Sequence, residues 1–246
     1  MEGMIDVHAH LLPGVDDGAS DWEEARWMLN CAYEQGIRAV IATPHYSHRQ
    51  DPDRLRQKAQ KLAIEAEKIV SDFKVYLGQE ILYFDSIVER LQEGHALTLA
   101  DSRYVLVEFM PQTPYKKMYQ GIRKIMLAGF YPVVAHVERY DALRDEGQME
   151  ELAETGCMMQ MNYRSLEGGF FNRNVRWCRR QVLAGRIGLL GTDAHHRDYR
   201  TPEIRESLRW LQTHANEQLS AMTRNHALDI LSQGMGESGA EILKTR

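Results

Sequence analysis

Cysteine is scarce in this chain: only Cys31, Cys157 and Cys178 occur among 246 residues. An odd and small number of cysteines indicates reduced core thiols in a cytoplasmic protein, not a disulfide-built secreted domain. The sequence has no apolar run close to the roughly 18 residues that a membrane span needs. Residues 1–6 also lack the basic and then apolar pattern of a signal peptide. We therefore expect a cytoplasmic protein without direct membrane insertion.

Basic residues are not in excess. The chain carries 30 Lys and Arg against 35 Asp and Glu, which gives a formal charge of −5. Nucleic-acid-binding proteins are usually basic, so this balance argues against nucleic acid as a partner. Three divalent cations held in one cleft would change the net charge to about +1, and the added positive charge would lie in that cleft. A negative chain could therefore still attract a phosphate dianion locally.

The length and composition fit a globular protein with a full core. Hydrophobic residues make up 43% of the chain and charged residues 26%, which are ordinary values for such proteins. A chain of this length can form one α/β barrel or two small domains. No linker-like stretch, repeat or low-complexity segment divides the sequence, so we expect a single domain over residues 1–246.

Strand-like and helix-like segments alternate from one end to the other. Apolar, β-rich runs occur at residues 4–8, 37–43, 74–82, 103–109, 131–136, 157–163 and 186–192. Helical patterns occur at residues 20–35, 53–71, 85–92, 115–128, 146–155, 174–184, 202–214, 216–221 and 225–233. Alternation of this kind, with apolar strands, predicts seven βα units and a parallel sheet.

Nine candidate metal ligands stand at or just after the expected strand ends: His8, His10, Asp17, His45, Glu80, Glu108, His136, Asp193 and His195. Imidazoles and carboxylates without cysteine are typical of a hydrolytic site for divalent ions, not of a structural zinc site. The carboxyl ends of parallel barrel strands meet at one mouth, where active sites form. We therefore expect these side chains to surround one pocket.

Each element of this set has a second interpretation when it is taken alone. His45 and His136 could be structural histidines, which are commoner than ligands after a strand. Glu80 and Glu108 close apolar strands, where a carboxylate is costly unless it is paired with an arginine or coordinated. The two side chains of His8-Ala9-His10 point to the same side of a strand. Their joint occurrence at successive strand ends favours the metal site.

Six short segments resemble the signatures of the PHP (polymerase and histidinol phosphatase) superfamily: Ile-Asp-Val-His-Ala-His at 5–10, Thr-Pro-His at 43–45, Gly-Gln-Glu at 78–80, Val-Glu-Phe at 107–109, Ala-His at 135–136 and Thr-Asp-Ala-His at 192–195. More narrowly, residues 15–18, 101–104, 113–115 and 136–141 resemble the bacterial manganese-dependent protein-tyrosine phosphatases. The block His-Val-Glu-Arg-Tyr at 136–140 is the most specific part. The resemblance extends from about Met4 to Leu231.

The resemblance implies a distorted (β/α)7 TIM-like barrel of the PHP type with three divalent metal ions. Manganese is the expected metal, with iron, zinc or cobalt as alternatives, and all nine ligand positions are filled. It implies that Arg139 and Arg200 bind phosphate. It also implies hydrolysis of phosphotyrosine, by metal-bound hydroxide, on the tail of a membrane-associated tyrosine autokinase of capsule or exopolysaccharide synthesis.

A cysteine-based mechanism is excluded by the sequence. Thiol-dependent tyrosine phosphatases need a cysteine followed by five residues and an arginine. The positions where that arginine would stand hold Ile37, Tyr163 and Ala184. Aromatic residues near strand ends are candidates to hold a phosphotyrosine ring: Tyr46, Tyr83, Phe84, Tyr115, Tyr163, Phe170 and Phe171.

Three other functions remain open at this point. A small-molecule phosphoesterase such as a histidinol-phosphate phosphatase would use the same metal set. A non-catalytic, metal-stabilised scaffold that binds a kinase tail would be favoured by missing ligands, and none is missing. A PHP-type exonuclease would call for a basic tract, which the sequence lacks. The sequence gives no indication of the oligomeric state.

Overall fold

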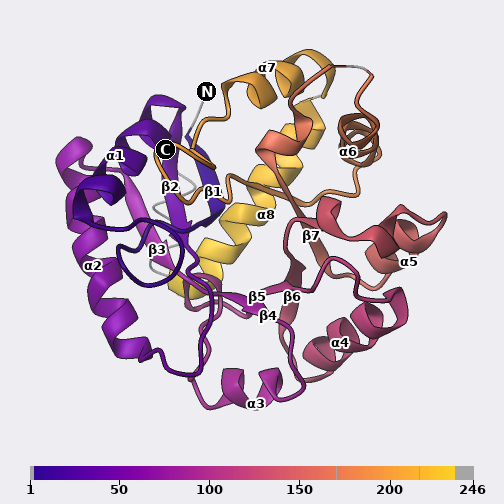
Figure 1. The fold of residues 1–246 in the computed structure, drawn as a ribbon, viewed down its shortest axis with the longest axis horizontal. Coiled ribbons are helices and arrows are strands. Elements are labelled where there is room, and N and C mark those ends of the chain that lie inside the picture. Colours follow the sequence, from indigo (N-terminus) through magenta and orange to yellow (C-terminus); the bar gives the residue numbers. More distant parts are fainter. Residues whose placement is uncertain (1–2, 170, 216, 236–246) are drawn as a thin grey trace.

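The structure is a computed structural model that describes residues 3–169, 171–215 and 217–235. Its strands all pair in parallel, and helices separate them along the chain (Figure 1). The strands are β1 Met4–Ala9, β2 Ile37–Ala42, β3 Lys74–Leu77, β4 Glu80–Leu82, β5 Tyr104–Glu108, β6 Tyr131–Val134, β7 Met158–Asn162 and β8 Leu189–Gly191. The expected α/β class with parallel pairing is thereby confirmed.

The helices occur in the order expected from the sequence, but their first and last residues differ from the expected ones. They are α1 Trp22–Glu34, α2 Pro52–Ile69, α3 Ile87–Gln92, α4 Tyr115–Leu127, α5 Gln148–Glu154, α6 Arg173–Leu183, α7 Arg205–His214 and α8 Glu217–Met235. Four short 3-10 turns are η1 Leu99–Asp101, η2 Val137–Arg139, η3 Asp141–Arg144 and η4 Tyr163–Leu166. The prediction of two helices at 216–221 and 225–233 is wrong, because α8 is continuous from Glu217.

The expected third strand, residues 74–82, is broken in two. Strands β1, β2 and β3 form one sheet, and β4 to β8 form a second sheet in sequence order. Gly78 lies at the break, where an added Cβ would stand 2.8 Å from Leu99 Cδ2 and 3.1 Å from Leu99 Cα. The turn η1 therefore packs directly on the backbone at this point. The described residues form eight strands where seven were expected, and Glu80 begins a strand instead of ending one.

Two isolated parallel bridges bring the two sheets together. Ala9 pairs with Ala194, and His45 pairs with Glu80. The first bridge is supported by the bond from the His10 amide to the Ala194 carbonyl (2.8 Å), and the second by the bond from the Tyr46 amide to the Glu80 carbonyl (2.8 Å). Both bridges lie at candidate ligand positions, so the sheets meet where the metal site is expected.

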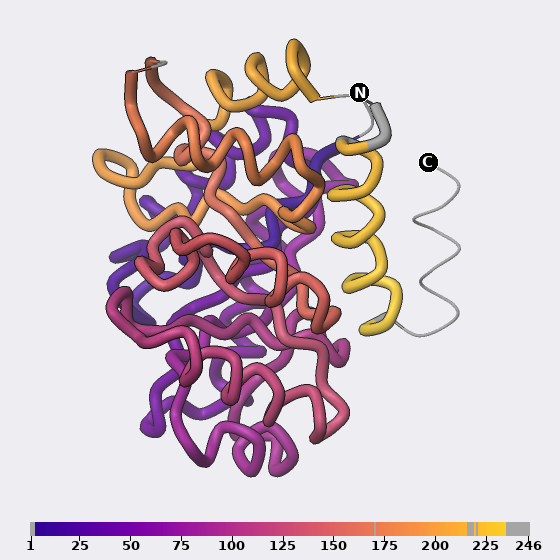
Figure 2. Tube along the Cα trace, turned by 90° about the vertical axis from the view of Figure 1, so that its right-hand side faces the viewer, coloured from indigo at the N-terminus to yellow at the C-terminus, as the bar shows by residue number. Residues whose placement is uncertain are grey.

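Helix α8 covers apolar side chains that precede the candidate ligands in their strands. Ala227, Ile230 and Leu231 of α8 form a buried cluster with strand residues that include Val7 and Leu106. Figure 2 shows α8 along one edge of the molecule, behind the sheets as they are seen in Figure 1. The remaining helices pack on the outer faces of the strands. None of the helices within the described residues is long and apolar enough to cross a membrane.

Candidate metal centre

Eight of the nine candidate ligands come together in three overlapping groups. The groups are His8, His10, Glu80 and Asp193; His45, Glu80 and Glu108; and His10, Asp17, His45 and His195, with ligand atoms in each group within 4.8 Å of one another. His136 adjoins the first two groups through Glu80 and Glu108. Residues from the first sheet, from the second sheet and from the loops that follow them thus share one site.

The first group has the spacing of a metal coordination sphere. His8 Nε2 and His10 Nε2 lie 3.3 Å apart, and each lies 3.2 Å from Glu80 Oε2. Asp193 Oδ1 lies 3.5 Å from the first nitrogen and 3.6 Å from the second. Four ligands around a zinc-like ion, with bonds of about 2.1 Å, stand roughly 3.4 Å apart in a tetrahedron. These donors therefore fit a divalent cation.

Glu80 also contacts His136, with its other oxygen, and His45 of the second group. Glu80 Oε1 lies 2.7 Å from His136 Nε2, and Glu108 Oε2 lies 3.5 Å from the same nitrogen. His45 Nδ1 lies 3.2 Å from Glu80 Oε2 and 3.5 Å from Glu108 Oε1. Because its two oxygens face different partners, the Glu80 carboxylate has the geometry of a bridging ligand.

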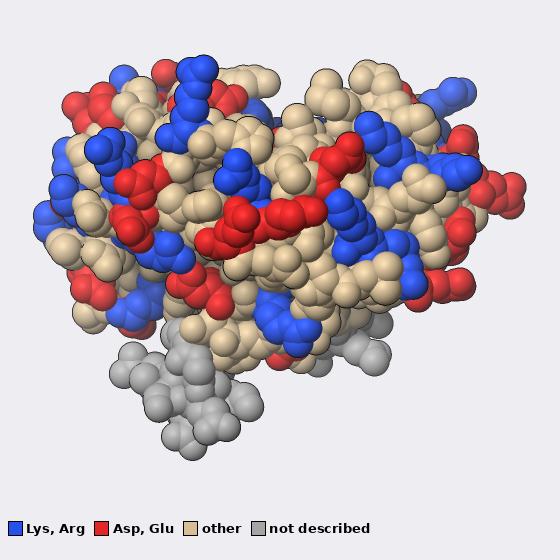
Figure 3. Space-filling model, turned by 90° about the horizontal axis from the view of Figure 1, so that it is seen from below, with Lys and Arg blue, Asp and Glu red and all other residues tan. Residues whose placement is uncertain are grey.

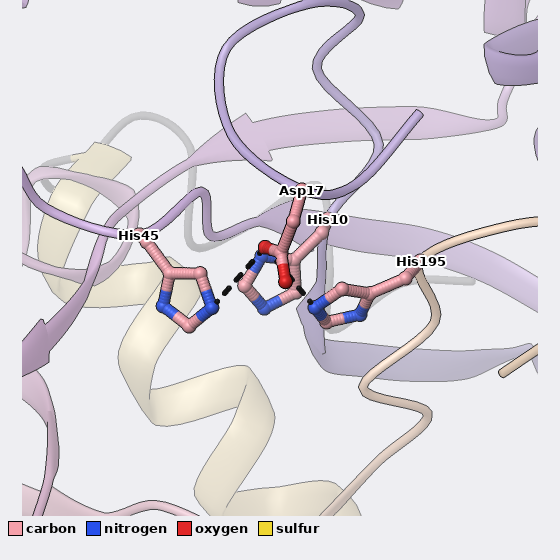
Figure 4. Close-up of side chains that lie close together, drawn as sticks. All are labelled: His10, Asp17, His45 and His195. Carbon is pink, nitrogen blue, oxygen red and sulfur yellow. Dashed lines mark ion pairs between the residues drawn. The ribbon is translucent and has the colours of Figure 1, made fainter. Parts of the chain in front are cut away.

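The third group is the outermost. Figure 4 shows Asp17 directed between His45 and His195, with His10 beside them. Asp17 Oδ1 lies 3.4 Å from His45 Nε2 and 3.6 Å from His195 Nε2, and 68% of its side chain is exposed. His8 and His10, in contrast, are fully buried. The site therefore has a closed inner part and an outer part that opens to solvent.

Arg139 and Arg200 lie at this centre, as the resemblance implies. One guanidinium nitrogen of each contacts Asp193: Arg139 Nη2 contacts Oδ2, and Arg200 Nη2 contacts Oδ1. Arg200 Nη1 also donates to His195 Nε2 over 3.1 Å, and Asn162 Nδ2 donates to Asp193 Oδ2 over 2.8 Å. The arginine side chains are 39% and 22% exposed. Two cationic groups thus stand on the accessible side of the ligands.

Two residues behind the ligands, Asp16 and Gln160, fix their orientation. Asp16 Oδ2 lies 2.7 Å from His10 Nδ1 and accepts the His45 amide over 2.8 Å. Gln160 Oε1 lies 3.1 Å from His8 Nδ1 and accepts the His136 amide over 2.8 Å. Such contacts set which ring nitrogen faces a metal. The only signal for Gln160 is that it stands as a polar residue between Met159 and Met161 of β7.

Left-handed backbone occurs at three residues of the centre that are not glycine. The φ angles are 32° at His136, 52° at Asp193 and 53° at Arg200. A side chain at positive φ is uncommon and costs energy, so such residues persist where the surroundings hold them and are often functional. At His136 this conformation starts η2, which places Arg139 one turn later. No glycine marks these turns in the sequence.

The charges of the centre depend strongly on one another. Burial raises the pKa of the Glu80 carboxyl group. The charge of His8 and the hydrogen bonds to His10 and His136 lower it by more, so this pKa lies well below the usual value. Burial also disfavours the His10 imidazolium, but hydrogen bonds to Asp16 and Glu80 raise its pKa to about 10.

Two further histidines shift in opposite directions. Burial disfavours the charged form of His136, yet hydrogen bonds to Glu108 and Glu80 raise its pKa to about 9. Burial, with the charges of His10 and Arg200, lowers the pKa of His195 to about 3. Without bound metal, protons on His10 and His136 offset part of the carboxylate charge.

The candidate aromatic residues include one half-buried stacked pair. Tyr46, the residue after His45, stacks on Phe84 with ring centroids 5.5 Å apart and planes 9° apart, and both side chains are half-buried. Tyr83 stacks on Phe109 (5.3 Å), and Tyr163 is buried away from solvent. Phe171 is 93% exposed, and residue 170 lies outside the described part. Tyr46 and Phe84 are therefore the pair best placed to contact a substrate ring.

The three cysteines have the character expected of core thiols. All are free and buried. Burial raises the pKa of Cys31 and of Cys157 to about 11, and that of Cys178 to about 12. A thiol nucleophile needs a lowered pKa, so none of them suits that role.

The family described as "Capsular polysaccharide synthesis, CpsB/CapC" matches residues 4–231. The chain belongs to the CpsB/CapC family. It is 32% identical to the tyrosine-protein phosphatase YwqE of Bacillus subtilis (strain 168), over 99% of this chain and 98% of that protein. It is 30% identical to the tyrosine-protein phosphatase CpsB of Streptococcus pneumoniae, over 83% of this chain and 88% of that protein.

Solved structures agree with this family membership. A structure described with YwqE and CpsB as "unique metal-dependent tyrosine phosphatases" superposes with a TM-score of 0.83 and 32% identity, over 93% of this chain and 94% of that chain. A phosphotriesterase homology protein from Escherichia coli superposes with a TM-score of 0.57 at 13% identity, over 92% and 97% of the two chains. The second likeness concerns the fold alone.

Proposed function

We propose that this CpsB/CapC protein is a metal-dependent protein-tyrosine phosphatase. The observation that carries the proposal is the convergence of nine imidazole and carboxylate side chains with two arginines at one partly open site. Relatives named tyrosine-protein phosphatases support it over most of the chain. Its substrate is phosphotyrosine on the tail of a membrane-associated tyrosine autokinase of capsule or exopolysaccharide synthesis, which requires a cytoplasmic location.

The three overlapping groups correspond to three divalent metal ions, with manganese as the native metal. The proposed ligands are His8, His10, Asp17, His45, Glu80, Glu108, His136, Asp193 and His195. Glu80, Asp193 and the buried histidines match the oxygen and nitrogen donors that manganese, iron, zinc and cobalt accept. The strands that carry them form a distorted (β/α)7 barrel of the PHP type, with β3 and β4 as the two halves of one broken strand.

Bound divalent ions supply Lewis-acid charge and lower the pKa of water toward neutrality. The chain itself positions the substrate. Arg139 and Arg200 bind phosphoryl oxygens, because each guanidinium keeps several N–H donors beyond the one that contacts Asp193. Tyr46 and Phe84 contact the phenyl ring of the substrate. A phenolate leaving group, with a pKa near 10, needs less protonation than an alkoxide.

Substitution of His136 and Asp193 tests this assignment. We expect His136→Ala and Asp193→Ala to abolish hydrolysis of a phosphotyrosine peptide while the far-ultraviolet circular dichroism stays unchanged, because both changes remove ligands without altering the outer core. Chelation should also abolish activity, and added manganese should restore it. Thiol alkylation serves as the control and should have little effect. Near-normal turnover in both variants would refute the metal centre as the active site.

A small-molecule phosphoesterase, such as a histidinol-phosphate phosphatase, is the second candidate. It would use the same ligands, so the ligands do not separate the two functions. The open outer group, with Asp17 68% exposed, favours a substrate presented on a protein. A comparison of kcat/KM for a phosphotyrosine peptide and for histidinol phosphate decides between them.

A further inference from the structure

A groove between α6 and α7 is lined by arginine and tryptophan and lies outside the metal centre. Its lining includes Trp177, Trp210 and five arginines, with no aspartate or glutamate: Arg144, Arg173, Arg176, Arg179 and Arg180. The whole chain has more acidic than basic residues, and both signs are interspersed over the face seen in Figure 3. The groove is therefore a local cationic surface on an acidic protein.

Two of these arginines hold the walls of the groove. The Arg144 guanidinium lies 3.8 Å from the centroid of the Trp177 ring, and it bonds to the Glu138 carbonyl and to Asn174 Oδ1. The Arg179 guanidinium lies 5.1 Å from the Trp210 ring and donates to the Leu166 carbonyl over 2.8 Å. These contacts fix both indoles, which lie half-buried and give the groove preformed sides.

The other arginines form a row on the exposed side of α6. Arg173, Arg176 and Arg180 are all exposed, and spacings of three and four residues place them on one helix face. Within the described residues, neither Arg173 nor Arg180 forms a hydrogen bond or ion pair with an acidic side chain. An anionic group could therefore bind here without displacing a protein partner.

The groove is linked to the turn that carries Arg139. Arg144 of η3 lines the groove and bonds to the carbonyl of Glu138, which precedes Arg139 in η2. Figure 1 shows α6 beside α7 on this side of the molecule.

We propose that this groove binds an acidic segment of the protein substrate, next to the phosphotyrosine. The inference rests on the proposed function, because it takes the groove to hold the same chain that enters the metal centre. Tryptophan and arginine are the residues that contribute most at protein-binding surfaces. A recess between two helices with fixed indole walls accepts a single extended peptide, whereas an anionic membrane calls for a flat or protruding basic face.

The spacing of the arginines sets the expected spacing of the acids. Arg173 and Arg180 are seven helical residues apart, which is about 10 Å at 1.5 Å per residue. A peptide in the polyproline II conformation advances about 3.1 Å per residue and returns to the same face every three residues. Acidic side chains three residues apart therefore match the two free guanidinium groups.

The test uses the metal-loaded enzyme and the double variant Arg173→Glu/Arg180→Glu. Its matched control is Arg54→Glu/Arg123→Glu, which makes the same charge change at exposed positions on α2 and α4. The probe is a fluorescent peptide with acids three residues apart and no phosphotyrosine. We expect the groove variant to bind it about tenfold more weakly than the native and control proteins, since it loses two charge-assisted contacts.

A kinetic comparison separates this inference from the proposed function. In the groove variant, the KM for a phosphotyrosine peptide with acidic flanks should rise about tenfold. Its kcat, its KM for a peptide with neutral flanks and its activity on p-nitrophenyl phosphate should stay at native values. If the native protein hydrolyses no aryl phosphate, the proposed function fails, and the binding measurement still decides on the groove.

Two results would overturn the groove assignment. One is equal binding of the acidic peptide by the groove and control variants. The other is binding of an oligonucleotide or of anionic phospholipid vesicles that is as tight as binding of the peptide and is lost in the groove variant. The second result would assign the groove to that class of partner instead.

Discussion

At the scale of single residues, the centre depends on side chains that never touch the substrate. His10 and His8 can present Nε2 to a shared point because Asp16 and Gln160 occupy the opposite nitrogens. An imidazole without such a partner can flip or take the other tautomer, which weakens its use as a ligand. The supporting residues are therefore as open to test as the ligands.

Asp16→Asn tests a residue that orients a metal-binding histidine. The amide retains the size of the side chain but loses the charge that faces His10 Nδ1. We expect metal affinity and activity to fall by about 10- to 100-fold, as for other partners of metal-binding histidines. Metal titration followed by activity measures the effect. Asp53→Asn, at an 86% exposed position, is the control, and equal behaviour of both variants would contradict the role of Asp16.

At the scale of elements, the segment between β3 and β4 positions Glu80. Only glycine fits at position 78, because η1 packs against the backbone there. Pairing with β2 and the residues after it keeps the same register on both sides of Gly78, so Glu80 stays beside His45. Its carboxylate is buried at the metal centre.

Gly78→Ala should therefore impair both stability and activity. Its Cβ would stand 2.8 Å from Leu99 Cδ2 and 3.3 Å from the Thr98 carbonyl oxygen. We expect a loss of about 1–3 kcal/mol in the free energy of unfolding, which is typical of overpacking, and reduced activity. Urea unfolding measures the stability. Gly169→Ala, where an added Cβ meets nothing within 4 Å, should be neutral, and an equal loss in both variants would argue against the packing explanation.

A second element-scale prediction concerns the contact between α1 and the segment after His195. Glu24 accepts bonds from the Ser20 amide (2.8 Å) and the Arg197 amide (3.1 Å). Burial raises the pKa of Glu24, but these hydrogen bonds have the larger effect. Together they lower this pKa to about 2 from 4.5. A lowered folded-state pKa adds stability above the unfolded pKa, and this stability is lost as the pH falls through the folded pKa.

The Glu24→Gln variant isolates this contribution. We expect it to unfold at a lower temperature than the native protein at pH 7. The difference should shrink as the pH falls from about 4.5 to about 2, because the native carboxylate becomes protonated in that window. Thermal melts of both proteins across this range provide the measurement. A difference in melting temperature that does not change with pH would mean that Glu24 acts through its size and not its charge.

At the scale of the whole molecule, metal binding and protonation are linked. The pKa of His10 is raised to about 10 and that of His136 to about 9 in the metal-free protein. Both side chains therefore carry a proton near neutral pH, and a metal ligand must give it up. Metal binding should raise the melting temperature, since an ion that binds only the folded state stabilises it.

Proton release upon metal binding checks this linkage. We expect about two protons to be released per molecule at pH 7.5, and the apparent metal affinity to rise between pH 7 and about 9. Calorimetric titration with manganese in buffers of different ionisation enthalpy counts the protons. His136→Asn should release about one proton fewer. Binding without proton release would show that carboxylates are protonated in place of these histidines.

The sequence by itself determined the parallel α/β class, the order of the elements and the candidate donors. Apolar strands and polar residues after strands act locally, so they can be read from adjacent positions. Family motifs within a few consecutive residues added the expected metal ions and Arg139. The same local signals predicted the cysteines as buried thiols, which the structure confirms.

Only the tertiary structure decided what lies between distant segments. Position 78 requires glycine because η1, about twenty residues later, packs against it, and Gln160 gains its role from His8. The positive φ angles at His136 and Asp193 are imposed by packing and not by glycine. The groove between α6 and α7 likewise exists because tertiary contacts bring Trp177 and Trp210 together. Long-range contacts of this kind leave no periodic or local mark on the sequence.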